Sequence, residues 1–202
     1  GRMLGLARKC ATTAALHATR HATRPATRLT RQQLHNIVLV APNIPGNTGC
    51  IGRTAMATGC RLHLVHPLGF STDERSLRRA GLDYWDRLDV REHASWNEFV
   101  DAEFGLAPWS PSAPRPWLFT THASGRVHWE ATYSEGDYLI FGSETRGAPE
   151  EVHRWIREHA GDAHRVCLPM VPEARSINLA TSVGVAVYEA QRQATLSREL
   201  RR

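Results

Sequence analysis

Apolar and polar positions alternate with two different periods from residue 34 onward. Short apolar runs typical of strands are separated by stretches with the three-to-four-residue period of a helix. This alternation predicts one α/β domain over residues 34–202, with a mostly parallel sheet flanked by helices. The predicted strands are 36–41, 61–66, 87–92, 117–121, 138–142 and 165–168, and the predicted helices are 47–58, 73–80, 95–104, 149–159 and one from about 176 to the region of 190.

The last predicted helix carries a continuous apolar stripe at three- and four-residue spacing, which predicts a face buried in the core. The stripe consists of Leu179, Val183, Val187 and Ala190. Ala180 and Gly184 add a second face of small residues, four positions apart. That small face fits either ordinary packing of a helix on a sheet or the close approach of another backbone.

The loop between the first predicted strand and helix carries the first candidate chemistry. Asn47 is predicted to be the N-cap of the helix, because its side-chain oxygen can accept a free N–H of the first turn. Arg53 follows six residues later, within two helical turns. A helix N-terminus attracts phosphate and other anions through its free N–H groups and its dipole. The pattern therefore fits an anion-binding site or the strand–turn–helix corner of any α/β domain.

The positive charge of the chain is concentrated at its beginning. Residues 1–33 hold seven Lys and Arg residues and no acid, so the remainder has a formal charge of −2, seven below the total of +5. The high isoelectric point is therefore no argument that the domain binds nucleic acid. A basic surface for RNA is expected to be local, built from clusters such as Arg78 and Arg79.

Residues 1–33 have a biased composition. They are rich in Arg, Ala and Thr and repeat Ala-Thr-Arg at 18–20, 22–24 and 26–28, and no acid precedes Asp73. Three interpretations stay open: a mitochondrial or plastid transit peptide, a disordered basic arm that adds non-specific affinity for RNA, or sequence without a role. Without a transit peptide, the protein is expected in the cytoplasm.

Several other kinds of site are not indicated. The four cysteines are widely spaced and form no CxxC, which argues against a disulfide scaffold or a zinc site, and Cys50 and Cys60 are expected to be buried. His63 and His66 lie three positions apart in a predicted strand, so their rings point to opposite faces and form no metal pair. The sequence predicts no metal site and, with no apolar run near ~20 residues, no membrane span.

Three segments carry a resemblance to a known family. They are Asn47-x-Gly49-x-x-x-Arg53, residues 141–147 and residues 168–179. In this order they resemble the three signature motifs of the SPOUT RNA methyltransferases, in the branch that methylates the ribose 2′-hydroxyl. The resemblance extends from about residue 36 to about residue 193.

A fourth segment narrows the resemblance. Residues 77–85, which include Arg79-Ala-Gly-Leu-Asp-Tyr84, are similar to the subfamily that methylates the wobble pyrimidine of tRNA. This resemblance implies a C-terminal trefoil knot, S-adenosylmethionine as methyl donor without a metal, a homodimer, and the tRNA anticodon loop as partner. Two alternatives stay open: a catalytically silent SPOUT protein that binds RNA or assists ribosome assembly, and a 2′-O-methyltransferase that acts on rRNA.

The resemblance also implies site residues. The catalytic candidates are Arg53, Asn47, Glu144, Ser176 and Asn178. The cofactor candidates are Thr121, Gly142, Leu168, Met170, Ser176 and Leu179. The candidates for RNA phosphate are Arg78, Arg79, Arg146 and Arg175.

Elementary chemistry agrees with parts of this assignment. Gly142 lets the backbone approach a ligand closely, Leu168 and Met170 offer apolar contact to an adenine ring, and Ser176 is placed to cap the last helix. The family analogy casts Arg53 as the group that activates the ribose hydroxyl. A guanidinium is a poor base, so Arg53 could instead bind phosphate and stabilise the developing alkoxide. Cys50 stands where the family commonly has a second Asn.

Overall fold

Six parallel strands form the framework of the protein. The computed structural model describes residues 35–71, 85–105, 113–122 and 126–200, all within the compact unit Arg31–Arg202. Over these residues the strand order is β3-β2-β1-β5-β4-β6, and every pairing is parallel. The strands are β1 (Asn36–Val40), β2 (Arg61–Val65), β3 (Val90–His93), β4 (Pro116–Phe119), β5 (Tyr138–Phe141) and β6 (Arg165–Val166).

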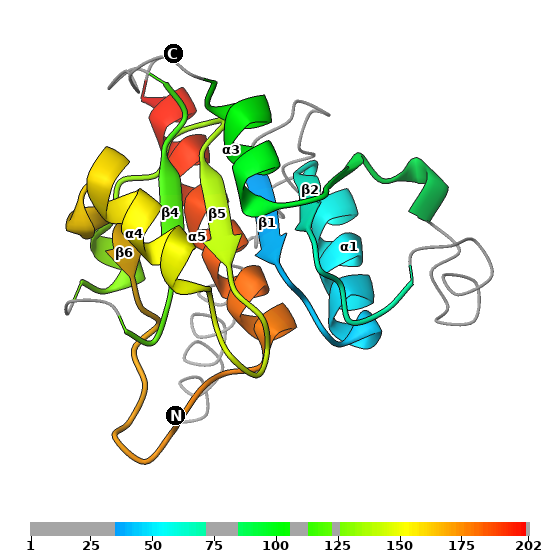
Figure 1. Ribbon diagram of the computed structural model, residues 1–202. Coiled ribbons are helices and arrows are strands. Elements are labelled where there is room, and N and C mark those ends of the chain that lie inside the picture. The colour runs from blue at the N-terminus through cyan, green and yellow to red at the C-terminus, as the bar shows by residue number, and fades with distance from the viewer. Residues whose placement is uncertain (1–34, 72–84, 106–112, 123–125, 201–202) are drawn as a thin grey trace, which may run out of the picture. The chain divides into compact units, whose positions relative to one another are not determined.

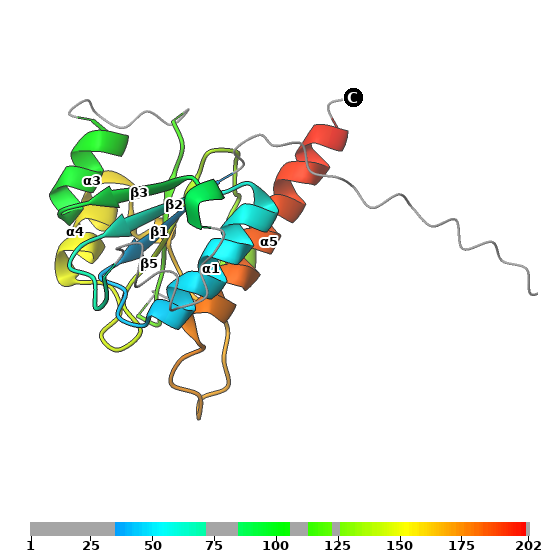
Figure 2. The same cartoon turned by 90° about the vertical axis from the view of Figure 1, so that its right-hand side faces the viewer.

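Among the described residues, four helices cover the two faces of the sheet. Figure 2 shows α1 and α5 on one side and α3 and α4 on the other. The helices are α1 (Pro45–Thr58), α3 (Trp96–Glu103), α4 (Glu150–His159) and α5 (Leu179–Glu199), and three short 3₁₀ turns are η1 (Trp85–Arg87), η2 (His128–Glu130) and η3 (Asp162–His164). The predicted α/β architecture is therefore confirmed. The predicted helix 73–80 lies outside the described residues.

Alternation along the strands produces two cores. In β1, Ile37 and Leu39 point into the core under α1 and α5, whereas Val38 and Val40 point into the core under α3 and α4. All of these side chains are almost fully buried. A central parallel strand is covered on both faces, which explains why its sequence is continuously apolar. No helix among the described residues is long and apolar enough to cross a membrane.

The beginning of α1 differs from the prediction. The helix starts at Pro45 with Ile44 as N-cap, and Ile44 offers no capping side chain. Proline is well suited to this position, because the first helical residues have no intrahelical acceptor for an N–H. The prediction that Asn47 is the N-cap was wrong, since Asn47 lies inside the first turn. The end of the helix is as predicted, with Gly59 in the left-handed conformation.

The beginning of α5 also differs. Asn178 is the N-cap, and its side-chain oxygen accepts hydrogen bonds from the N–H groups of Ala180 and Thr181. Ser176 lies before the helix, so the prediction that it is the cap was wrong. The predicted apolar stripe is confirmed, because all four of its residues are buried in the core. The helix continues to Glu199, well beyond the predicted end.

Two smaller expectations need correction. The strand expected at 87–92 begins only at Val90, because Leu62 of β2 takes Val90 as its first partner and the chain before it forms η1. Cys60 is buried as expected, but Cys50 is exposed on α1.

Candidate functional site

The candidate site lies at the carboxyl ends of the central strands. The sheet order reverses between β1 and β5, because β2 and β3 continue on one side and β4 and β6 on the other. Figure 1 shows β2 beside β1, with β4 and β6 beyond β5. Ligands of parallel α/β sheets bind outside the strand ends at such a point. A cavity of about 550 Å³ lies there, within the usual range of small-molecule sites.

The cavity brings together most of the residues that the sequence singled out. Its walls come from the loops after β1, β4 and β5 and from the segment between β6 and α5. The predicted site residues that line it are Asn47, Thr121, Gly142, Glu144, Arg146, Leu168, Met170, Arg175, Ser176, Asn178 and Leu179. Residues more than 120 positions apart in the chain therefore face one space.

Glu144 supplies the cap that α1 lacks. Its carboxylate accepts hydrogen bonds from the backbone N–H groups of Asn43 (2.7 Å) and Ile44 (3.1 Å) and from the side-chain amide of Asn47 (3.0 Å). A carboxylate at a helix N-terminus is favourable for the helix dipole as well. Glu144 therefore ties the loop after β5 to the beginning of α1.

Asn47 and Asn178 extend this connection to α5. The side-chain amide of Asn178 donates to Oδ1 of Asn47 at 3.0 Å, while Oδ1 of Asn178 caps α5. Glu144, Asn47 and Asn178 thus form one chain of hydrogen bonds, which we call the rim chain. It joins the three segments that resemble the family motifs.

The rim chain also determines the charge of Glu144. Burial raises the pKa of this carboxyl, but the hydrogen bonds from Asn43, Asn47 and Ile44 lower the pKa more, so it lies below its ordinary value. The carboxylate is therefore ionised at neutral pH. Its four acceptor positions are largely taken by the N–H groups, which makes it a positioning group rather than a proton acceptor.

Gly142 has no room for a side chain, because its own loop approaches it closely. A Cβ built on Gly142 would lie 1.9 Å from the backbone N of Ala148 and 2.0 Å from the backbone C of Gly147. The loop 142–148 folds back on itself through two backbone hydrogen bonds between Ser143 and Gly147. The close approach at Gly142 is therefore made by its own loop.

The arginines do not all reach the cavity. Arg146 and Arg175 line it and are exposed, which suits contact with a phosphate outside the cavity. Arg53 is on the exposed side of α1, beside Met56, and does not line the cavity. Arg78 and Arg79 lie outside the described residues.

Several residues that line the cavity were not predicted from the sequence. Ile44 and His153 line the cavity, the first from the loop after β1 and the second from α4. Nothing in the helical pattern of α4 distinguished His153, which is 6% exposed, from a packing residue. Burial lowers the pKa of its imidazole, so His153 is neutral at physiological pH.

A second polar cluster was also missed. His63 is buried, and half-exposed His66 pairs with Glu92, which confirms that these two histidines form no pair. His63 instead meets His93 and Glu103 on the α3 side of the sheet. The pairing of β2 with β3 could have suggested the two histidines. Glu103 comes from the predicted helix 95–104, but the sequence did not show where that helix packs against the sheet.

Comparison with known proteins decides the family. Residues 35–188 match the model of the SpoU rRNA methylase family, which covers every described segment except the end of α5. The chain belongs to the SpoU methylase family. The three segments that resemble the family motifs in sequence are those that the rim chain joins in space.

Proteins and solved structures of similar sequence match most of the chain. A tRNA (cytidine(34)-2′-O)-methyltransferase from Polaromonas is 48% identical over 161 residues, which are 79% of this chain and 91% of the relative. A structure from work on the 2-OH methylation of C/U34 on tRNA is 42% identical, with a TM-score of 0.65, and the match covers 80% of this chain and 91% of that one.

A structure of lower sequence identity was solved with AdoMet bound. It is an AdoMet-bound rRNA methyltransferase from Sinorhizobium meliloti, 25% identical, with a TM-score of 0.61. The match covers 81% of this chain and 58% of that one.

The cavity of this SpoU methylase has the chemistry that such a cofactor requires. Half-buried Leu168 and Met170 and buried Leu179 supply apolar contact for a purine ring. Thr121 and Ser176 supply hydroxyls, and the loop 142–148 supplies backbone groups that can read the edge of the base. The residues present therefore fit S-adenosylmethionine.

Proposed function

We propose that this protein transfers a methyl group from S-adenosylmethionine to the ribose 2′-hydroxyl of the wobble pyrimidine, position 34, of tRNA. The observation that carries the proposal is the cavity at the β1–β5 switch point, whose walls the rim chain holds together. The substrate is supported by the Polaromonas relative and by the C/U34 structure, both above 40% identity over most of the chain.

The cofactor occupies the cavity in this proposal. Thr121, Gly142, Leu168, Met170, Ser176 and Leu179 hold it through apolar contacts and backbone groups. It supplies an electrophilic methyl group, and methyl transfer from it needs no metal. By the family resemblance, the segments that line the cavity form a C-terminal trefoil knot.

The protein contributes mainly position and charge. The rim chain fixes the beginnings of α1 and α5, so that the groups facing the cavity are held before the RNA arrives. Arg53 stabilises the ribose oxygen as it loses its proton, or binds the phosphate beside it. Arg146 and Arg175 bind phosphates of the anticodon loop at the mouth of the cavity. Arg78 and Arg79, which lie outside the described residues, are further candidates for binding RNA phosphate.

A homodimer explains why Arg53 is outside the cavity of its own chain. The exposed sides of α1 and α5 present apolar residues to solvent, among them Met56 (43% exposed), Val185 (43%) and Tyr188 (59%). A Cβ built on Gly184 meets nothing within 4 Å, so a partner backbone can approach there. Because α5 begins at the cavity, a partner on this face places the site at the boundary between protomers.

The decisive experiment combines the full chain with radiolabelled S-adenosylmethionine and total tRNA, followed by mapping of the labelled nucleotide. We expect label on the ribose of position 34. A matched tRNA transcript with a 2′-deoxynucleotide at position 34 should accept none.

Other outcomes distinguish the alternatives. If label appears only when rRNA is supplied, the substrate of the enzyme is rRNA and not tRNA. If the protein does not bind S-adenosylmethionine in calorimetry and does not transfer label, it would be a catalytically silent, RNA-binding member of the family.

The basic segment 1–33 is assigned the role of a mitochondrial or plastid leader. Its composition, with seven basic residues and no acid, supports this assignment. Fusion of residues 1–33 to a fluorescent protein should direct it to the organelle. Diffuse fluorescence would instead support a cytoplasmic enzyme whose basic segment adds affinity for RNA.

A further inference from the structure

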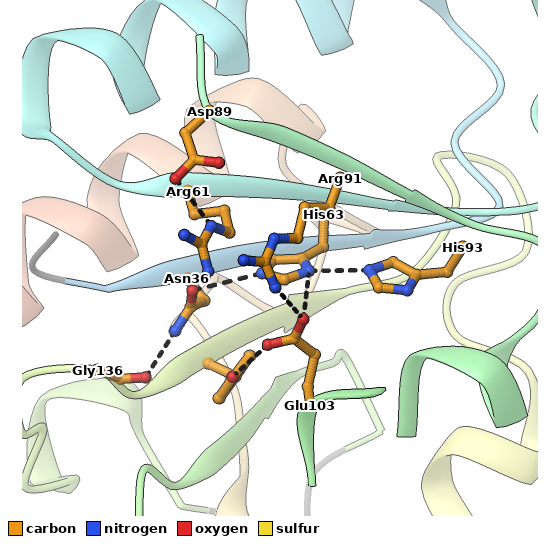
Figure 3. A network of polar contacts seen from close by, with 9 residues as sticks. Asn36, Arg61, His63, Asp89, Arg91, His93, Glu103 and Gly136 are labelled. Carbon is orange, nitrogen blue, oxygen red and sulfur yellow. Dashed lines mark hydrogen bonds and ion pairs between the residues drawn. The ribbon is translucent and has the colours of Figure 1, made fainter. Parts of the chain in front are cut away.

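Three side chains with metal-binding atoms meet under α3, apart from the cavity. His63 comes from β2, His93 from the end of β3 and Glu103 from the end of α3 (Figure 3). Nδ1 of His63 is 3.0 Å from Nε2 of His93 and 3.9 Å from Oε1 of Glu103, and the three atoms all lie within 4.8 Å of one another. None of the three residues lines the cavity.

The hydrogen bonds around His63 aim a lone pair into this group. The side-chain amide of Asn36 donates to the carbonyl of Gly136 at 2.7 Å, so Oδ1 of Asn36 faces Nε2 of His63 at 3.4 Å. That contact assigns the proton of His63 to Nε2 and leaves Nδ1 as an acceptor towards His93. Histidines that bind metals are commonly oriented in this way, with the second ring nitrogen donating to an oxygen.

The charges of the group also suit a cation. His63 and His93 are 0% and 5% exposed, and burial lowers the pKa of both, that of His63 to about 4. Both imidazoles are therefore neutral at physiological pH. Burial raises the pKa of Glu103, but its contacts with Tyr138, His63 and Arg91 lower it more, so the carboxylate is ionised. Two neutral imidazoles and one carboxylate are a donor set that Zn²⁺ prefers.

The packing restricts the rings to this arrangement. Phe99 of α3 meets both imidazoles edge-on, at 5.5 Å from His63 and 5.2 Å from His93 between ring centroids. Zinc bonds of about 2.0–2.2 Å in a tetrahedral site place ligand atoms roughly 3.3–3.6 Å apart. Because the three atoms lie within 4.8 Å of one another, Glu103 has to move closer to the histidines, and it sits at the end of its helix.

Arg91 is the competitor for the carboxylate. Its guanidinium donates to Oε1 of Glu103 at 2.9 Å, and its side chain is 48% exposed. Tyr138 donates to the other oxygen at 2.8 Å and can remain there. An ion therefore has to displace Arg91, which can turn into solvent, and the hydrogen bond between the two imidazoles, since His93 must carry its proton on Nδ1 for Nε2 to bind.

We propose that His63, His93 and Glu103 form a structural site for a divalent transition ion such as Zn²⁺, with a fourth position open to water. The ion would join β3, the edge strand, to β2 and to the end of α3. The site is independent of the proposed methyl transfer, which needs no metal.

The test titrates the metal-free full chain with Zn²⁺ against a chromophoric chelator and records thermal unfolding in parallel. We expect one Zn²⁺ per chain and a higher melting temperature with zinc. His93→Gln should weaken zinc binding at least tenfold. The matched control, His66→Gln, changes a half-exposed histidine directly after the strand that carries His63 and should bind zinc as the unaltered protein does.

A second variant keeps the test decisive if His93→Gln unfolds. Arg91→Ala removes the competitor and should bind zinc several-fold more tightly than the unaltered protein. Equal zinc binding by His93→Gln and His66→Gln would overturn the proposal. So would weaker zinc binding by Arg91→Ala, because the cluster would then be only a network of hydrogen bonds.

Discussion

At the scale of single residues, the site depends on side chains that act on other protein groups. Glu144, Asn47 and Asn178 use most of their hydrogen-bonding capacity on backbone N–H groups and on one another. They are catalytic candidates by the family resemblance. Their hydrogen bonds connect three loops, and we propose that they act on the reaction by positioning these loops.

Glu144→Gln should preserve the shape of the side chain and remove its charge. Hydrogen bonds to charged groups contribute about 1.5–3 kcal/mol, against about 1 kcal/mol for neutral ones. We expect kcat/KM for tRNA to fall roughly ten- to hundredfold, since 1.4 kcal/mol corresponds to a factor of ten. Glu92→Gln, on the surface of β3, is the control, and an unchanged rate for Glu144→Gln would contradict the role of the rim chain.

The same reasoning gives a pH dependence. Because the pKa of Glu144 is lowered in the folded protein, its contribution to stability is present above the unfolded pKa and is lost as pH falls through the folded pKa. In acid titrations followed by thermal unfolding, Glu144→Gln should therefore lose less stability than the unaltered protein. If the melting temperatures of both proteins fell equally with pH, the N–H groups of Asn43, Ile44 and Asn47 would not be what lowers the pKa of Glu144.

Arg53→Ala should separate binding from chemistry. Since Arg53 does not line the cavity of its own chain, calorimetry should find the affinity for S-adenosylmethionine unchanged, while methyl transfer to tRNA is lost. Arg157→Ala, which removes an exposed arginine paired with Glu150 on α4, should retain activity. If Arg53→Ala methylated tRNA at the normal rate, Arg53 would have no role in the reaction.

At the scale of elements, the loops decide whether the cavity exists. The loop 142–148 folds so tightly that its first residue has no room for a side chain. Periodicity predicted the strands and helices that flank such loops because their residues repeat the geometry of a sheet or helix. It could not predict which loop touches which, because contacts such as Glu144 with Ile44 depend on the assembled sheet.

Gly142→Ala is expected to open this loop. The new Cβ would overlap backbone atoms that no side-chain rotation can move, and overpacking costs about 1–3 kcal/mol. Both the melting temperature and the affinity for S-adenosylmethionine should fall. Gly46→Ala is a matched control on α1, since a Cβ there meets nothing within 4 Å. If the two variants had the same melting temperature and the same affinity for S-adenosylmethionine, the space at Gly142 would not be restricted as described.

The caps show the same limit of sequence information. Asn47 and Ser176 have the chemistry of N-caps, yet Ile44 and Asn178 hold those positions. Glu144 takes over the capping of α1 from about 100 positions away, and Asn178 is then oriented by Asn47. A cap supplied by another loop carries no local signal, so only the structure could reveal it.

At the scale of the whole molecule, two cores share one sheet and α5 belongs to both a core and a surface. Its buried stripe was predicted because it has a helical period. Its opposite side carries Val185 and Tyr188, which are 43% and 59% exposed. The proposed dimer would cover these side chains of α5 together with the exposed apolar residues of α1.

Tyr188→Glu should therefore produce monomers. A carboxylate at the centre of an apolar interface is costly to bury without a partner charge, and the symmetry of a dimer places two of them near one another. Light scattering after size exclusion should give the mass of one chain, and methyl transfer should fall because each cavity loses its neighbour. Glu158→Gln, on the exposed side of α4, is the control and should remain a dimer. A monomeric Tyr188→Glu with full activity would show that one chain contains the complete site, and Arg53 would then have to reach the RNA from within its own protomer.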